Sequence, residues 1–86
     1  MSTEELKPIS TARVAQELTK LSEGRAKGEI TANEYEHRFA RMIGELRDRR
    51  IDGNRAEILA ALKPLKDDGT VNLTDWDRLV RSLGLV

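Results

Sequence analysis

The sequence contains no cysteine and only one residue each of Trp, Tyr and Phe. The absence of cysteine excludes disulfide bonds and thiolate metal sites, and it suits a reducing compartment. No apolar run approaches the roughly 18 residues that a membrane span requires. We therefore expect packing between helices or strands to hold the fold without cross-links.

An excess of charge of either sign is also absent, because 15 Lys and Arg residues balance 15 Asp and Glu residues. A neutral chain lacks the long-range field that steers proteins to nucleic acid or anionic membranes, so such binding would need a local patch. The first ten residues are acidic and polar where a signal peptide would be basic and then apolar. These features predict a cytoplasmic protein that does not bind membranes.

The length of 86 residues suits one domain with a small core, since such a chain buries only about 60–65% of its unfolded surface. Residues 1–9 contain Pro8 and show no apolar period, so we expect them to form a flexible leader. Residues 10–86 are expected to form a single helical domain.

Ser10 is the first signal for the start of a helix, because it is a favourable N-cap followed by apolar residues at helical spacing. This pattern predicts a helix over residues 11–22 or beyond. Gly24 and Gly28 are the two candidate stops.

Thr31 and Asn54 each precede a glutamate by three residues, which is the pattern of a capping box. The first box predicts a helix that ends near Arg50. The second predicts a shorter helix that stops near Lys63, because Pro64 follows it.

A glycine, an aliphatic residue and an aromatic residue occur twice in the sequence at the same spacing. Thr74, in the second copy, is the expected N-cap of a fourth helix. This repeat predicts two helix-loop-helix units in tandem. A chance likeness between two glycine stops, each followed by a capped helix, stays open. The first copy is Gly28, Ile30 and Tyr35, and the second is Gly69, Val71 and Trp76.

The apolar stripes of these four segments predict an all-α fold around one small core. The expected core residues are Val14, Leu18, Leu21, Ile30, Tyr35, Phe39, Met42, Ile43, Leu46, Ile58, Leu59, Leu62, Val71, Trp76, Leu79, Val80 and Leu83.

Residues 18–43 resemble the bacterial short C-terminal domain (SHOCT), in which a leucine helix, a glycine turn, Ile-Thr, an acidic stretch, an aromatic residue and a basic helix follow in order. The resemblance implies a helical hairpin used for oligomerisation or for tethering a partner, without catalysis. In that family the segment normally ends the protein, whereas residues 44–86 follow it here. The residues that carry the resemblance are Leu18, Leu21, Gly28, Ile30, Thr31, Glu34, Tyr35 and Phe39.

The two loops also resemble degenerate EF-hands, with a glycine at the turn position, an aliphatic residue two positions later, and Glu34 or Asp75 as the last ligand. Calcium requires oxygen ligands at the first, third and fifth loop positions. The resemblance therefore implies helix-loop-helix units that do not bind calcium. The residues at those positions are Glu23, Arg25 and Lys27 in the first loop, and Pro64, Lys66 and Asp68 in the second.

Residues typical of catalysis are scarce. His37 is the only histidine, and it lies opposite the apolar stripe of its helix, where an exposed surface histidine is expected. Neither a nucleophile elbow nor a phosphate-binding glycine loop is present. Paired acidic residues occur at turns and in first turns of helices, where negative charge interacts favourably with the helix dipole. We expect no enzyme activity, no cofactor and no metal.

One region is locally basic, around the second half of the predicted second helix and the turn after it. Arginine binds carboxylate and phosphate bidentately, so this region could contact an acidic protein surface or nucleic acid. Alternatively, Glu45, Asp48 and Asp52 pair with the arginines in an ordinary solvated face. No aromatic residue is interleaved for stacking on single strands. The arginines are Arg38, Arg41, Arg47, Arg49, Arg50 and Arg55.

Ala40 and Gly44 lie one turn apart, away from the centre of the apolar stripe. A glycine within a helix costs about 1 kcal/mol relative to alanine, which suggests that something approaches closely there. The approaching element is either another helix of the same chain or a second subunit.

These observations favour a non-catalytic module that binds another protein through helix-face contacts, as an adaptor or inhibitor, with a homo-oligomer as one form of such binding. The alternative is a small nucleic-acid-binding regulator that uses the arginines. Small size and the use of Arg, Ala and Leu suggest a bacterial or phage source.

Overall fold

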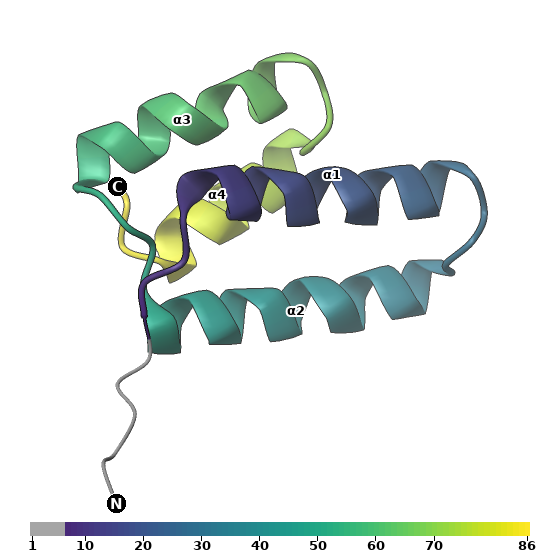
Figure 1. Cartoon of the computed structure of the whole chain (residues 1–86). Coiled ribbons are helices and arrows are strands. Elements are labelled where there is room, and N and C mark those ends of the chain that lie inside the picture. Colours follow the sequence, from purple (N-terminus) through teal and green to yellow (C-terminus); the bar gives the residue numbers. More distant parts are fainter. Residues whose placement is uncertain (1–6) are drawn as a thin grey trace, which may run out of the picture.

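Four α-helices form the part of the chain that this computed structural model describes, residues 7–86 (Figure 1). The expected all-α class is confirmed. Residues 1–6 of the expected leader lie outside the described residues. The helices are α1 (Thr11–Ala26), α2 (Ala32–Arg49), α3 (Arg55–Asp67) and α4 (Leu73–Ser82).

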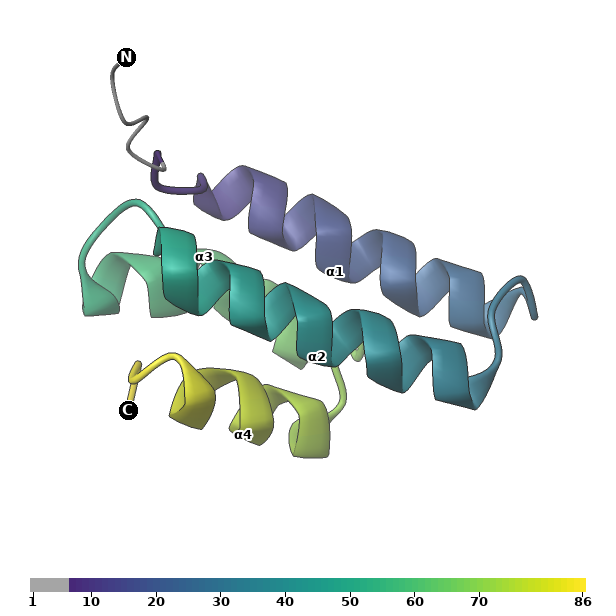
Figure 2. The same ribbon diagram turned by 90° about the horizontal axis from the view of Figure 1, so that it is seen from below.

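Helix α2 lies in the middle of the arrangement. Seen from below, it runs between α1 and α4, with α3 behind it (Figure 2). Helix α1 contacts α2 and α3, and α2 also contacts α4. The starts of α1 and α3 and the ends of α2 and α4 gather at one end of the molecule, and the α1–α2 and α3–α4 turns lie toward the other (Figures 1 and 2).

The N-caps of the first three helices are those that the sequence predicts. The side chain of Ser10 accepts a hydrogen bond from the N–H of Arg13 at 3.2 Å. Thr31 and Asn54 each form a complete capping box with the glutamate at the third helical position. The backbone hydrogen bond from Thr31 lowers the pKa of Glu34 from its ordinary value, so this box is strongest when the carboxylate is ionised.

The start of α4 differs from the prediction. Asn72, not Thr74, is the N-cap, and its side chain accepts a hydrogen bond at 2.8 Å from the N–H of the third helical residue. Asn72 follows Gly69 at the same spacing at which Thr31 follows Gly28. The repeated spacing thus marked the correct cap, because asparagine caps helices at least as well as threonine.

Gly28 ends α1. Its φ of +75° is the left-handed conformation that glycine adopts readily. Its N–H donates to the carbonyl of Arg25 at 3.2 Å, and the N–H of Glu29 donates to the carbonyl of Gly24 at 2.8 Å, which together form a Schellman motif. Gly24, the other candidate stop, instead lies inside the helix, buried next to Ile30.

Helix α3 continues past Pro64 to Asp67, although we expected it to stop near Lys63. Proline removes one donor, but its carbonyl still accepts a hydrogen bond from the residue four positions later. The final turn is held by tertiary contacts, because Leu65 packs against the core and its carbonyl accepts a hydrogen bond from Val71 at 2.9 Å. Packing therefore outweighs the helix-breaking tendency of proline here.

The core consists mainly of residues that the stripes predict. Phe39, Leu62 and Leu79 have no exposed surface. Three further buried residues, Ile9, Ile51 and Leu85, were not predicted, because they lie outside helices and belong to no helical period. The other buried apolar residues are Val14, Leu18, Ile30, Ile43, Leu46, Ile58, Val71 and Val80. The remaining predicted members, which are only partly buried, are Leu21, Tyr35, Met42, Leu59, Trp76 and Leu83.

A parallel β-bridge joins Ile9 to Ile51. The N–H of Ile9 donates to the carbonyl of Arg50 at 2.9 Å, and the N–H of Asp52 donates to the carbonyl of Ile9 at 2.8 Å. Because Ile9 is also buried, the packed domain begins inside the segment that we expected to be a leader. The bridge fixes the entry into α1 against the α2–α3 connection.

Arg50 follows α2 with φ 67° and ψ 157°, a region that essentially only glycine occupies without strain. Both of its backbone groups are hydrogen-bonded, since its N–H donates to the carbonyl of Leu46 at 2.8 Å and its carbonyl accepts from Ile9. The bridge therefore holds an arginine in a conformation that costs about 1–3 kcal/mol.

Replacing Phe39 by alanine should lower the free energy of unfolding by about 3–5 kcal/mol, because the ring is fully buried and leaves a cavity. Thr31→Ala should cost less, about 0.5–2 kcal/mol, since it removes a cap on an exposed helix start. Thermal and urea melts measure both. The reverse ranking would show that the assigned buried face of α2 is wrong.

Arg50→Gly should be more stable than Arg50→Ala by about 0.5–2 kcal/mol. Both changes remove the side chain, but only glycine relieves the positive φ, and its greater entropy in the unfolded chain offsets part of the gain. Urea denaturation of the two variants gives the difference directly. If the alanine variant is as stable as the glycine variant, the backbone at this position is not strained.

Candidate functional site

The structure does not gather the six predicted arginines into one patch. Arg38 and Arg41 lie over a groove between α1 and α2, whereas Arg47 and Arg50 lie over a second groove beside the end of α4. The cluster seen in the sequence is therefore divided between two sides of α2, because residues close in a helical sequence point in different directions.

The other two arginines line neither groove. Arg49 is half-buried, and its Nε donates a hydrogen bond to the carbonyl of Lys7 at 3.2 Å. Arg55 is exposed on the first residue of α3. Arg49 thus helps to hold the segment before α1, which is a structural contact rather than a binding surface.

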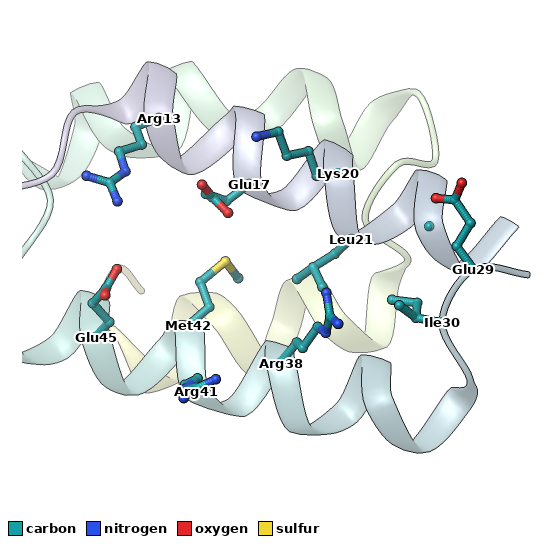
Figure 3. A pocket seen from close by; sticks show the side chains of 11 residues that line it. Arg13, Glu17, Lys20, Leu21, Glu29, Ile30, Arg38, Arg41, Met42 and Glu45 are labelled. Atoms are coloured by element: carbon teal, nitrogen blue, oxygen red, sulfur yellow. The ribbon is translucent and has the colours of Figure 1, made fainter. Parts of the chain in front are cut away.

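The α1–α2 groove is a shallow depression of about 420 Å³ that begins beside the α1–α2 turn. Leu21, Ile30 and Met42 supply its apolar surface, with charged side chains from both helices around them (Figure 3). In Figure 3, Arg13 of α1 faces Glu45 of α2 across the groove. The basic lining residues are Arg13, Lys20, Arg38 and Arg41, and the acidic ones are Glu17, Glu29 and Glu45. The two signs nearly cancel.

The α2–α4 groove has a volume of about 430 Å³ and lies where the ends of α2 and α4 meet the start of α3. Its apolar surface is made by Leu83, which is half-buried, together with the edges of four buried residues. Among residues 7–86, its charged lining residues are Arg47 and Arg50, and none of the lining residues is acidic. The full lining is Leu46, Arg47, Arg50, Ile51, Ile58, Ser82, Leu83, Gly84 and Leu85.

The acidic residues expected to neutralise the arginines do not pair with them. Within residues 7–86 the ion pairs are Arg78 with Glu36 and Arg81 with Asp77, each at 2.8 Å. Glu45, Asp48 and Asp52 form none of these pairs. The expected pairing of these three acidic residues with the arginines is therefore not found in the described part of the chain, while the alternative of a solvated face stays open because most of the arginines are exposed.

Ala40 and Gly44 are both exposed on α2. A Cβ added at Gly44 would meet no atom within 4 Å. The expectation that another helix of the same chain approaches closely at Gly44 is therefore wrong, because the glycine faces open space. A second subunit at this face stays a prediction.

Sequence reasoning did not foresee one buried polar contact. The hydroxyl of Tyr35 donates a hydrogen bond to Oδ2 of Asp75 at 2.7 Å and so joins the starts of α2 and α4. Asp75 is only 5% exposed. The repeat held a signal, because Tyr35 and Asp75 occupy neighbouring positions in the two copies of the capped helix start. Burial and this hydrogen bond raise the pKa of the Tyr35 phenol well above its ordinary value.

Each aromatic ring lies beside a cationic side chain. The guanidinium of Arg78 is 4.5 Å from the ring centroid of Phe39, and Arg25 and Lys66 lie 5.7 Å from the centroids of Tyr35 and Trp76 respectively. Such pairs contribute about 0.5–1 kcal/mol each at exposed sites. They also occupy ring faces that a nucleic-acid base would need for stacking.

The two acidic residues at the last position of the EF-hand-like loops already accept hydrogen bonds within the domain. Glu34 accepts a hydrogen bond from the N–H of Thr31 at 2.9 Å, and Asp75 accepts from Tyr35. No three His, Asp or Glu side chains among residues 7–86 come together as a set of metal ligands. His37 is exposed, as expected from its position on α2.

Comparison with family models, with curated proteins and with solved structures finds no match for the chain. In the described residues no helix has both the length and the apolar character needed to cross a membrane.

The pKa of Tyr35 predicts a loss of stability at alkaline pH. Because folding favours the neutral phenol, the stabilisation is complete below the unfolded pKa of about 10 and falls as pH rises above it. Tyr35 is the single tyrosine, so tyrosinate absorbance follows it directly. The folded protein should ionise at higher pH than the urea-unfolded chain, and Tyr35→Phe should lose less stability above pH 10 than the parent. Coincident folded and unfolded titrations would contradict this assignment.

Proposed function

We propose that this chain is a non-catalytic protein-binding module that acts through its helix faces, as an adaptor or as an inhibitor of a larger protein. The supporting observation is the pair of surface grooves on either side of α2, each lined by apolar residues together with arginines that form no ion pair within residues 7–86. Apolar contact area with arginine at its edge is typical of protein interfaces.

The division of the arginines favours a protein over nucleic acid as the partner. A nucleic-acid backbone requires a continuous basic track, but Arg38 and Arg41 lie over one groove and Arg47 and Arg50 over another. The chain is also neutral overall, and its aromatic rings lie against its own cations. A nucleic-acid-binding regulator is therefore the less favoured function.

The resemblance to the short C-terminal domain adds support of a different kind. Residues 18–43 span much of α1, the Gly28 turn and the first two-thirds of α2, which carry most of the lining of the α1–α2 groove. A segment of that family serves oligomerisation or partner tethering, so we propose the same kind of role here, with a homo-oligomer among the complexes. The proposed setting is the cytoplasm.

Affinity capture from lysate of the source cell, with and without nuclease, tests the class of partner. We expect the same protein partner in both samples. Two charge-reversal variants, Arg38→Glu/Arg41→Glu and Arg47→Glu/Arg50→Glu, should locate the binding groove because one of them loses the partner and the other keeps it. Gly44→Leu tests whether the partner binds the exposed face of α2 between the grooves. Thermal melting checks that this variant is folded.

The nucleic-acid alternative is tested by measuring how binding to labelled duplex DNA and RNA changes with salt concentration. Four phosphate contacts would weaken binding roughly a hundredfold between 50 and 200 mM salt. Micromolar or tighter binding of this kind, lost in Arg47→Glu/Arg50→Glu, would replace the proposed function by the nucleic-acid alternative. Loss of all captured protein after nuclease treatment would point the same way.

A further inference from the structure

We propose that the α2–α4 groove docks an acidic amphipathic helix of the partner, with its apolar side on Leu83 and its carboxylates on Arg47 and Arg50. This inference rests on the proposed function and specifies which groove binds and what chemistry it recognises.

The two grooves differ in the charge of their lining residues. The α1–α2 groove is lined by basic and acidic side chains in nearly equal number, so it has no clear preference for a charged partner. In the part of the chain that the structure describes, the lining of the α2–α4 groove contains Arg47 and Arg50 and no acidic residue. A partner segment with carboxylates complements this groove, whereas a basic segment would bring like charges together.

The apolar surface of the groove indicates a helical segment. An extended peptide over Leu83 and its apolar neighbours would find no strand edge among residues 7–86 with which to pair its backbone. A helix satisfies its backbone groups internally and presents apolar side chains at spacings of three and four residues. The volume of about 430 Å³ suits a few such side chains.

The backbone conformation of Arg50 also supports a binding role for this groove. Its conformation is one in which glycine is more stable, yet the sequence has an arginine there. Within residues 7–86 neither ion pair involves the Arg50 side chain, so its guanidinium has no carboxylate partner there. Strain retained at a residue whose side chain lines a groove is typical of a position used for binding.

The probe is a capped, fluorescein-labelled synthetic peptide of about 16 residues, with leucines along one helical face and glutamates at the flanks of that face. A second peptide has lysine in place of every glutamate. Fluorescence anisotropy measures binding of each to the full chain, and amide chemical shifts map the contacts. We expect the acidic peptide to bind and to shift Leu46, Ile51 and Leu83, and the basic peptide to bind at least tenfold more weakly.

Variants separate binding from folding. Arg47→Glu/Arg50→Glu should weaken binding of the acidic peptide about tenfold or more, as expected for two lost rim ion pairs. The control Lys27→Glu/Lys63→Glu changes the net charge equally at exposed positions outside both grooves and should leave binding within about twofold. Arg50→Gly should bind more weakly than the parent chain, and urea melts of the two proteins show whether any loss of binding comes from unfolding.

Several results would overturn the inference. They are equal binding of the two peptides, an equal loss in the lysine control, and no binding of the acidic peptide up to millimolar concentration. Acidic-peptide shifts confined to Leu21 and Met42 would move the site to the α1–α2 groove and leave the proposed function intact. Tighter binding to duplex DNA than to the peptide, abolished by Arg47→Glu/Arg50→Glu, would reject both.

Discussion

Helix α2 presents its apolar side to the other helices, with Phe39 fully buried at its centre, and the remaining structure is organised around that burial. With so few aromatic residues, a single ring supplies the largest buried side chain, and Phe39 belongs to one buried cluster with side chains from α1, α3 and α4. The same requirement leaves the opposite side of α2 uncovered, which is where Gly44 faces open space. The two grooves form along the edges of this covered face, where α2 meets α1 and α4.

The polar contacts of the domain join elements that the apolar core already brings together. Tyr35 donates to Asp75 across the starts of α2 and α4, and the bridge between Ile9 and Ile51 connects the entry into α1 with the α2–α3 connection. The bridge has a cost, since it holds the backbone of Arg50 in a region suited to glycine. That cost links folding to the candidate binding surface, because the same residue lines the α2–α4 groove.

The candidate site shows how a one-dimensional cluster separates in three dimensions. Arginines that are neighbours in the sequence of α2 lie on two of its sides, and one of them, Arg49, holds the segment before α1 instead of facing a groove. Sequence could identify these residues as the basic region. It could not assign Leu83 and Leu85 to the same surface as Arg47, because that contact depends on how α4 packs against α2.

Local physics in the sequence determined the helices. Three N-caps, both capping boxes, the Gly28 stop and most of the core follow from interactions between residues within a few positions of each other. Tertiary structure alone decided the features that depend on contacts between distant segments. Packing of Leu65 carried α3 past Pro64, pairing with Ile51 drew Ile9 into the core, and the burial of Asp75 gave Tyr35 its partner. These contacts join residues tens of positions apart or override a local tendency, and no periodic pattern in the sequence records them.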